Sequence, residues 1–231
     1  MKYVIKWTIG NTKNNNAFKC LFHSINLFQK KFKNKFEYNV YYNNIDEKLL
    51  IKNFKYDVKY TNQEQTFKNF LDIPPKGPAW KLYPARTNIN SYEILIDNDL
   101  VVYNFDIIEK FMADNKIYIT EGLERRFGKY DKIISSNLRF NSGLICLPPG
   151  FDLNEKIQKN ISKNDSWDSH FDEQGLLSYI ITKENYVLIR LQEIFVCLDK
   201  LVNSKNGLHF VGLNSGHNKL WSEYVQKSIK I

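Results

Sequence analysis

Two acidic residues, Asp97 and Asp99, end one apolar run of the sequence and precede a second run that begins at Leu100. In a strand, alternate side chains share a face, so both carboxylates could point the same way. Two carboxylates at the end of a buried strand are costly unless a cation lies between them. Mg²⁺ and Mn²⁺ prefer oxygen ligands and leave positions free for substrate phosphates. The D-x-D spacing therefore favours a divalent-metal site, although a simple acidic turn after a strand has the same pattern.

The elements around this pair follow a strand, helix, strand order. Residues 3–9 read as a strand, and apolar residues at three- and four-residue steps from Phe18 to Phe32 predict a helix, capped by one of the asparagines at 14–16. Residues 36–42 predict a second strand. This order predicts a parallel sheet covered by helices, and ligands bind beyond the C-terminal ends of such strands. The prolines at 74, 75 and 78 mark a loop within the same domain.

Composition limits the class of protein. The chain has 231 residues, of which 43% are hydrophobic and 15% aromatic, enough for one sizeable globular domain. The net charge of +8 could attract nucleic acid, an anionic membrane or a phosphorylated molecule. The only lysine cluster, at residues 30–35, suits a helix C-terminus, where cations are favourable, although peripheral membrane contact stays open. We find no nucleic-acid motif and expect no nucleic-acid partner.

The cysteines and the hydropathy pattern indicate the compartment. Cys20, Cys146 and Cys197 have no C-x-x-C spacing, which favours reduced, buried thiols. The first residues do not resemble a signal peptide, and no run approaches the ~18 to 20 apolar residues that cross a bilayer. We therefore expect a cytoplasmic protein without a transmembrane segment.

Further short motifs place charged and amide side chains near the ends of predicted elements. They are Arg86, Asn141-Ser142-Gly143, Asp172-Glu173-Gln174-Gly175, and His209 with Gly212, Lys219 and Trp221. Each has a simpler interpretation. Lys81 and Arg86 read equally well as solvated charges, and Asp172 and Glu173 would stabilise the first turn of a helix through its dipole. The order of the motifs is more informative than any one of them.

That order resembles the nucleotide-sugar-dependent glycosyltransferases of the GT-A type, and the layout is similar to the glycogenin and bacterial galactosyltransferase-like enzymes. The resemblance implies one α/β, Rossmann-like GT-A domain over residues 1–231, with a mixed, mostly parallel central sheet flanked by helices. Residues 1–105 would bind the nucleotide, and residues 106–231 the sugar and the acceptor. The implied enzyme is hexosyltransferase-like and moves a sugar from a nucleoside diphosphate donor, expected to be UDP, to a hydroxyl of a saccharide or other acceptor.

The resemblance also implies which residues bind the donor diphosphate. Asp97, Asp99 and His209 would hold Mn²⁺ or Mg²⁺, which neutralises the charge on the leaving diphosphate. Arg86 and Lys219 would add positive charge to the same group. Here Gly212 and Lys219 are seven residues apart, and this longer segment carries His217 as a second possible ligand. We prefer His209.

Other matching positions would contact the nucleoside, the sugar and the acceptor. Thr8 and Ile9 would line the base and ribose pocket, with Asp97 also near the ribose. Asn141 and Ser142 would bind the donor sugar or the acceptor. One acid of the Asp172-Glu173-Gln174 segment would be the base of an inverting reaction, or a side chain there would steady the reacting centre of a retaining one.

Two other functions compete with glycosyl transfer. A nucleotidyltransferase or sugar-nucleotide synthetase also combines a nucleotide fold with acidic metal ligands, but its Gly-rich loop after the first strand is missing from residues 11–16. A non-catalytic protein that binds an acidic polymer would explain the positive charge.

Overall fold

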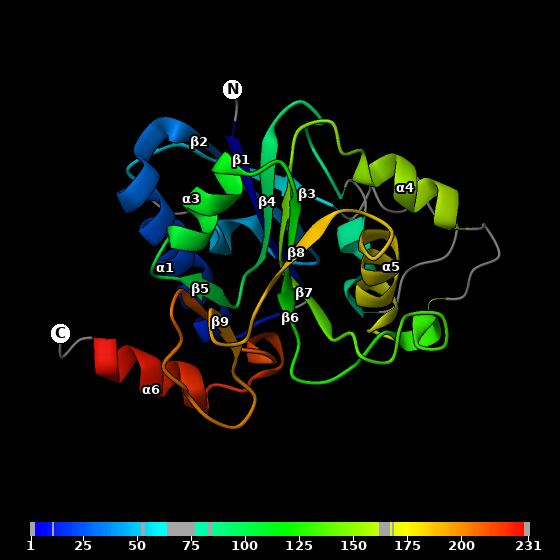
Figure 1. Cartoon of the computed structure of the whole chain (residues 1–231). Coiled ribbons are helices and arrows are strands. Elements are labelled where there is room, and N and C mark those ends of the chain that lie inside the picture. Colours follow the sequence, from blue (N-terminus) through cyan, green and yellow to red (C-terminus); the bar gives the residue numbers. More distant parts are fainter. Residues whose placement is uncertain are drawn as a thin grey trace.

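A seven-stranded sheet forms the centre of the computed structural model, which describes residues 3–10, 12–51, 54–63, 77–82, 85–161, 167 and 169–228 (Figure 1). The predicted loop prolines Pro74 and Pro75 lie outside these ranges. The strand order is β3-β2-β1-β4-β7-β6-β8. The strands are β1 (Tyr3–Gly10), β2 (Phe36–Asn43), β3 (Val58–Asn62), β4 (Tyr92–Asp97), β6 (Ile117–Glu121), β7 (Phe140–Leu147) and β8 (Tyr186–Ile189).

Strand direction explains where a ligand can bind. All neighbours in the sheet pair in parallel except at β7, which runs against both β4 and β6. The predicted mixed, mostly parallel sheet is thus confirmed. From β1 the chain continues to β2 on one side, whereas β4 pairs with β1 on the other. A crevice opens beyond the C-terminal ends of two parallel strands at such a point.

A second sheet of three strands stands beside the first. Its order is β5-β10-β9, formed by β5 (Leu100–Val102), β9 (Ile194–Val196) and β10 (Gly207–His209). Only Asn98 and Asp99 separate β4 from β5, so the chain passes from one sheet to the other at the D-x-D motif. The D-x-D motif therefore lies where the two sheets meet.

Helices cover both faces of the large sheet. One face packs against α1 (Asn15–Phe32) and α3 (Asp106–Ala113), and the other against α4 (Leu153–Asn160) and α5 (Asp172–Ile181). The helix α6 (Lys219–Ser228) joins α1 and the small sheet in a third apolar cluster. None of the described helices is both long and apolar enough to cross a bilayer.

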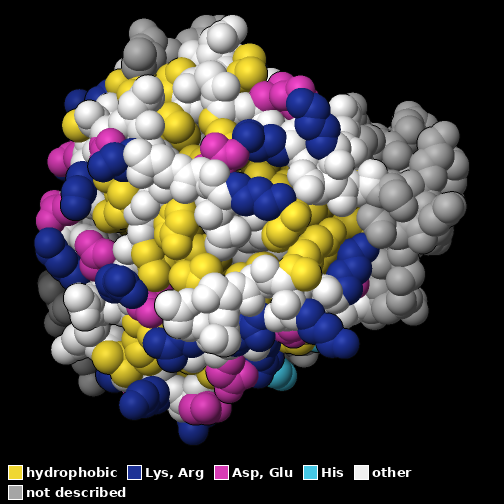
Figure 2. All heavy atoms as spheres, turned by 45° about the vertical axis from the view of Figure 1, so that its right-hand side comes forward, with side chains coloured by type: hydrophobic (Ala, Val, Ile, Leu, Met, Phe, Trp, Pro, Cys, Tyr) yellow, Lys and Arg dark blue, Asp and Glu magenta, His cyan; other side chains and the backbone are white. Residues whose placement is uncertain are grey.

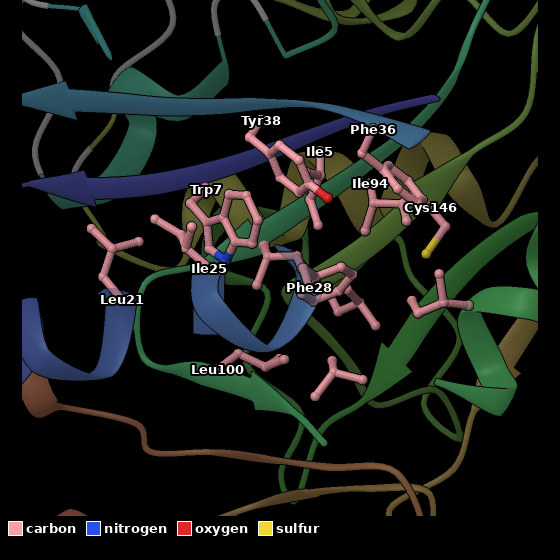
Figure 3. Close-up of a cluster of buried hydrophobic side chains, with 14 of the residues drawn as sticks. Ile5, Trp7, Leu21, Ile25, Phe28, Phe36, Tyr38, Ile94, Leu100 and Cys146 are labelled. Carbon is pink, nitrogen blue, oxygen red and sulfur yellow. The ribbon is translucent and has the colours of Figure 1, made fainter. Parts of the chain in front are cut away.

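The sheet face that α1 covers shows how the sequence specifies the packing of helix on sheet. The Asn14 side chain accepts a hydrogen bond from the Asn16 backbone N–H (3.1 Å) and so caps α1, as the asparagine run predicted. The apolar stripe of α1, which includes Ile25 and Phe28, then packs on Trp7 of β1 (Figure 3). Burial of each such large side chain contributes roughly 1.5–3 kcal/mol to folding. Every second side chain of β1 is therefore buried in this core.

The surface shows how the positive charge is distributed. On the face in Figure 2, Lys and Arg side chains lie among acidic side chains and beside a central apolar band. The positive charge of this face is thus dispersed rather than gathered into one stripe.

Candidate active site

Asp97, Asp99 and His209 converge at the C-terminal edge of the large sheet. Thr8 and Asp97 are register partners on β1 and β4, and the Thr8 hydroxyl donates to Asp97 Oδ1 (3.0 Å). Asp99 follows in the turn, and His209 ends β10. Its Nε2 lies 3.1 Å from Asp99 Oδ1, and ligand atoms of all three residues lie within 4.8 Å of one another.

The donor set of this group fits a divalent ion. Two carboxylates and one imidazole offer the mostly oxygen set that Mg²⁺ and Mn²⁺ accept. Burial by itself lowers the pKa of His209, but the Asp99 and Asp97 carboxylates outweigh it, so the pKa is raised. The imidazole therefore lies in a negative field that favours positive charge. His217, in contrast, is exposed beyond the turn at residues 213–215, and the structure does not bring it to this group.

Gly143 of β7 makes room for His209. A Cβ atom added at Gly143 would lie 2.6 Å from His209 Nδ1, closer than real Cβ contacts come. The Gly143 backbone N–H donates to Asn141 Oδ1 (2.9 Å), which fixes the local path of the strand. The Asn141-Ser142-Gly143 motif is therefore part of the site partly because its last residue has no side chain.

Lys81 provides the cation nearest to Asp97. It lies on a 3₁₀ turn, Gly77–Leu82, and its Nζ is 2.6 Å from Asp97 Oδ1. Burial lowers the pKa of Lys81, but the pull of Asp97 and then of Glu173 is stronger, so the pKa is raised and the ammonium stays charged. From the sequence alone, Lys81 and Arg86 read equally well as solvated charges, and only Arg86 was assigned to the diphosphate, whereas the structure places Lys81 beside Asp97.

Arg86 has a different role from the one predicted. Its guanidinium donates to the backbone carbonyls of Ser91, Phe151, Ile89 and Asn88, with the shortest distances 2.6 Å. Ser91 immediately precedes β4, whereas Asp97 ends it, so Arg86 lies at the opposite end of the strand. Only 2% of Arg86 is exposed. We therefore correct its assignment from diphosphate contact to buried structural cation.

Glu173 is the acid of α5 that lines the same cavity as Asp97 and Lys81. Its Oε2 accepts from the Ser142 hydroxyl (3.3 Å), and both residues line a small cavity of about 30 Å³ together with Lys81 and Asp97. Burial raises the pKa of Glu173 to about 7, because the opposing effect of Lys81 is smaller and Asp97 raises it further. A carboxyl group with this pKa can accept or donate a proton near neutral pH.

The neighbours of Glu173 are held by backbone groups. The Asp172 carboxylate accepts from the backbone N–H groups of Lys129 (2.8 Å) and Ser169 (2.9 Å), which anchors the start of α5. The role of Asp172 as a base stays a prediction. The Gln174 side chain accepts from the Ser142 N–H (3.2 Å) and donates to the Arg126 carbonyl (2.7 Å). Gln174 lines a second pocket, of about 70 Å³, with Asn141.

Two predicted pocket residues fall outside the group of converging side chains. Ile9 alternates with Thr8 along β1, so its side chain lies in the apolar core under α1, and only its backbone faces the crevice. Lys219 begins α6 with an exposed side chain. No hydrogen bond or ion pair in the described part of the chain connects Lys219 to Asp97 or Asp99. The diphosphate role of Lys219 therefore stays a prediction.

Two residues that the structure brings to the site, Asn98 and Lys6, had no predicted role there. Asn98, between the two aspartates, exchanges two side-chain hydrogen bonds with Asn214, each 3.0 Å, and so connects the D-x-D turn to the segment after β10. Lys6 lies buried under the site and lines the cavity with Glu173. Burial lowers the pKa of Lys6 to about 8 despite Glu93. A charged residue inside an apolar strand was the signal for Lys6.

Comparisons with known structures identify the fold. No family model and no curated protein matches the sequence. A crystal structure of the galactosyltransferase LgtC, in complex with donor and acceptor sugar analogs, matches with a TM-score of 0.60 at 11% identity, over 95% of this chain and 94% of that one. Mouse xyloside xylosyltransferase 1 in its apo form also gives 0.60, at 11% identity, over 93% and 99%. The chain has the GT-A glycosyltransferase fold.

An active-site mutant of LgtC, with glutamate in place of glutamine, matches as well, at a TM-score of 0.58 and 12% identity, over 90% of this chain and 87% of that one. In the GT-A fold of this chain, Thr8, Asp97 and Asp99 lie where the parallel strands end. The predicted fold class is thus confirmed by sheet order and by overall similarity.

Proposed function

We propose that this protein is a metal-dependent glycosyltransferase that moves a sugar from a nucleoside diphosphate, with UDP as the nucleotide, to a hydroxyl group. The observation that carries the proposal is the Asp97, Asp99 and His209 group at the strand ends of a GT-A fold. Mn²⁺ or Mg²⁺ bound there would stabilise negative charge on the leaving diphosphate. The neighbours of known activity, a galactosyltransferase and a xylosyltransferase, support the same reaction class.

The side chains around the ion have separate tasks in this reaction. Thr8 orients Asp97 through their hydrogen bond, which leaves the second carboxylate oxygen for the ion. Lys81 supplies a fixed positive charge beside Asp97 and is placed to stabilise the departing phosphate oxygens. Lys81 takes over the part first assigned to Arg86. The contact of Lys219 with the same group stays a prediction.

We assign the proton-handling role to Glu173. Each oxygen of the Asp172 carboxylate already accepts a backbone N–H, and the amide of Gln174 cannot take up a proton at neutral pH. Glu173 lies between Ser142 and Lys81, with a pKa near 7. It is the residue of its motif that could deprotonate an acceptor hydroxyl or steady positive charge at the anomeric carbon.

The two halves of the sheet support the proposed division of labour. Residues 1–105 contribute β1 to β4 and Asp97, and we assign them to the nucleotide. Residues 106–231 contribute β6, β7 and β8 with Asn141, Ser142 and Glu173, and we assign them to the sugar and acceptor. We further propose a cytoplasmic protein with a saccharide acceptor and no nucleic-acid partner, which the three free, buried cysteines and the dispersed lysines support.

Hydrolysis of a panel of nucleotide sugars, with Mn²⁺ or with EDTA, tests the proposal. We expect release of a nucleoside diphosphate that needs the metal and falls at least a hundredfold in Asp99→Asn. The matched control is Asp106→Asn, an exposed acid of α3, which should behave like the parent protein. Turnover of no nucleotide sugar would overturn the enzyme proposal. Release of pyrophosphate from a nucleoside triphosphate and a sugar phosphate would replace it with a nucleotidyltransferase.

A further inference from the structure

Asn98 is the buried residue between the two acidic residues of the D-x-D motif. Only 2% of it is exposed, and its backbone N–H donates to the Thr8 carbonyl (3.1 Å). Its side-chain amide faces that of Asn214, and the two amides exchange a pair of hydrogen bonds, each 3.0 Å. Such a pair fixes both the distance and the rotation of the two side chains, because each amide donates and accepts at once. The D-x-D turn is therefore attached to Asn214 at its middle residue.

Asn214 belongs to the segment that follows the imidazole of the metal group. It lies in a 3₁₀ turn, Leu213–Ser215, shortly after His209. Within the same segment, the Phe210 N–H donates to the Asp99 carbonyl (2.8 Å). A backbone hydrogen bond and the amide pair thus join the same two segments. One of these segments carries both carboxylates of the metal group, and the other carries its imidazole.

A third segment, the loop between β1 and α1, anchors the turn that contains Asn214. The Thr12 hydroxyl donates to the Asn214 carbonyl (2.9 Å) and accepts from the Asn14 N–H (3.1 Å). The Asn14 amide donates to the Leu213 carbonyl and to Asn218 Oδ1 (2.7 Å), while its oxygen caps α1. The turn is thus attached to the start of a long helix. A residue that is itself anchored in this way can position the D-x-D turn.

The ligands of the metal group need to be held together because two of them repel each other before an ion binds. Ligand atoms of Asp97, Asp99 and His209 lie within 4.8 Å of one another, and carboxylates at such distances favour separation. Neutral amides can fix the turn without adding a charge that would compete with the ion. Replacement of residues that orient metal ligands typically lowers metal affinity 10–100-fold. The amide pair is therefore placed to have a measurable effect on ion binding.

We propose that Asn98 and Asn214 form a positioning pair that holds the two carboxylates and the His209 imidazole at ion-binding distance before the donor arrives. In the described part of the chain, neither amide is hydrogen-bonded to a residue of the metal group, so the pair acts through the backbone of the turn. The inference rests on the proposed metal-dependent function, because it names residues that prepare the site for the ion. A preformed site should bind Mn²⁺ in the absence of any nucleotide.

A double-mutant cycle on Mn²⁺ affinity tests the pair. Calorimetric titration with MnCl₂, without nucleotide, compares the parent protein with Asn98→Ala, Asn214→Ala and the double variant. We expect each single variant to bind Mn²⁺ at least tenfold more weakly. The double variant should lose little more than either one, because both substitutions remove the same contact. Ser215→Ala, at the next and exposed residue of the same turn, is the matched control and should bind Mn²⁺ like the parent protein.

A spectroscopic measurement separates positioning from a general loss of structure. The electron paramagnetic resonance spectrum of bound Mn²⁺ depends on the arrangement of its ligands. It should change in Asn214→Ala and stay that of the parent protein in Ser215→Ala. Thr12→Val removes the hydroxyl that holds the Asn214 carbonyl and keeps the shape of the side chain, and this second variant should weaken Mn²⁺ binding at least threefold. Melting temperatures in EDTA identify any variant that fails to fold.

Three results would overturn the pair. They are parent-like Mn²⁺ affinity with an unchanged spectrum in Asn214→Ala, losses in the two single variants that add in full in the double variant, and Mn²⁺ binding by the parent protein only when UDP is present. Nucleotide-sugar hydrolysis is measured with the same proteins. A parent protein that binds Mn²⁺ but hydrolyses no nucleotide sugar would overturn the proposed function, whereas the affinity cycle decides the pair.

Discussion

Lys81 and a divalent ion would share one carboxylate. The Lys81 ammonium lies 2.6 Å from Asp97 Oδ1, where it offsets negative charge in the metal-free protein. We predict that Lys81→Met, which keeps the apolar stem, raises Mn²⁺ affinity several-fold in the absence of nucleotide, because a competing cation is gone. The same change should lower nucleotide-sugar hydrolysis at least tenfold. Calorimetric titration with MnCl₂ measures the first effect, with Lys81→Arg as the charge-preserving control. Weaker Mn²⁺ binding by Lys81→Met would contradict the competition.

Glu173 should give the metal-free protein a distinctive pH dependence. Folding raises its pKa from 4.5 to about 7, so between these values the folded chain holds more protons than the unfolded chain. The stabilisation is fully present below the unfolded pKa and is lost as pH rises through 7. At 1.36 kcal/mol per pKa unit, a rise from 4.5 to about 7 corresponds to a loss of about 3 kcal/mol of stability as the pH rises.

We therefore predict that Glu173→Gln flattens the fall in the free energy of unfolding between pH 5 and pH 8. Urea denaturation in EDTA at several pH values measures this free energy of unfolding. Glu155→Gln, on the surface of α4, is the control that should leave the slope unchanged. An unchanged slope in Glu173→Gln would show that another group is responsible.

At the scale of single elements, β7 determines how closely His209 can approach the sheet. We predict that Gly143→Ala lowers Mn²⁺ affinity at least tenfold while the protein stays folded, because the new methyl group would displace the imidazole. Gly150→Ala is the comparison. Its φ of +83° makes alanine unfavourable, by about 1 kcal/mol, but no atom lies within 4 Å of the added Cβ. It should reduce stability and leave Mn²⁺ binding unchanged. Equal Mn²⁺ affinities for all three proteins would refute the steric argument.

The positions of strands and helices also explain which site residues could be predicted from the sequence. Asp97 and Asp99 were predictable because an apolar strand ends there, and ligands gather at such ends. The choice among Asp172, Glu173 and Gln174 was not, because successive residues of a helix point about 100° apart, and one residue of uncertainty in its start changes which side chain faces the site. Lys81 and Arg86 looked alike for a related reason. Both follow a proline-rich loop, whose path depends on tertiary packing.

For the whole molecule, Arg86 illustrates how a buried charge can mimic a functional one. We predict that Arg86→Met destabilises the protein by about 3–5 kcal/mol, since it leaves several buried carbonyl oxygens without a donor and removes the cation near Glu93. Mn²⁺ affinity of the folded fraction should not change. Urea denaturation and metal titration measure the two quantities. A variant of parent stability with weak nucleotide binding would restore the diphosphate role.

The overall fold was more predictable than the site because it depends on many residues at once. The apolar period from Phe18 to Phe32 and the strand, helix, strand order each specify a layer of the GT-A fold. The three-stranded sheet was not predicted. Its strands β5, β9 and β10 have three residues each, too short for alternation to be visible, and the β5–β10 pairing joins segments about a hundred residues apart.

The position of the D-x-D turn between two sheets has a mechanical consequence. Asp97 ends a strand of the large sheet, and His209 ends a strand of the small one, so a bound ion would cross-link two parts that otherwise open separately. At a hundred times its dissociation constant, such an ion adds about 2.7 kcal/mol to the stability of whatever must open to release it. Amide hydrogen exchange with and without Mn²⁺ should therefore slow in β5, β9 and β10 more than in β2 and β3. The bound ion would then couple the unfolding of the small sheet to the unfolding of the large sheet.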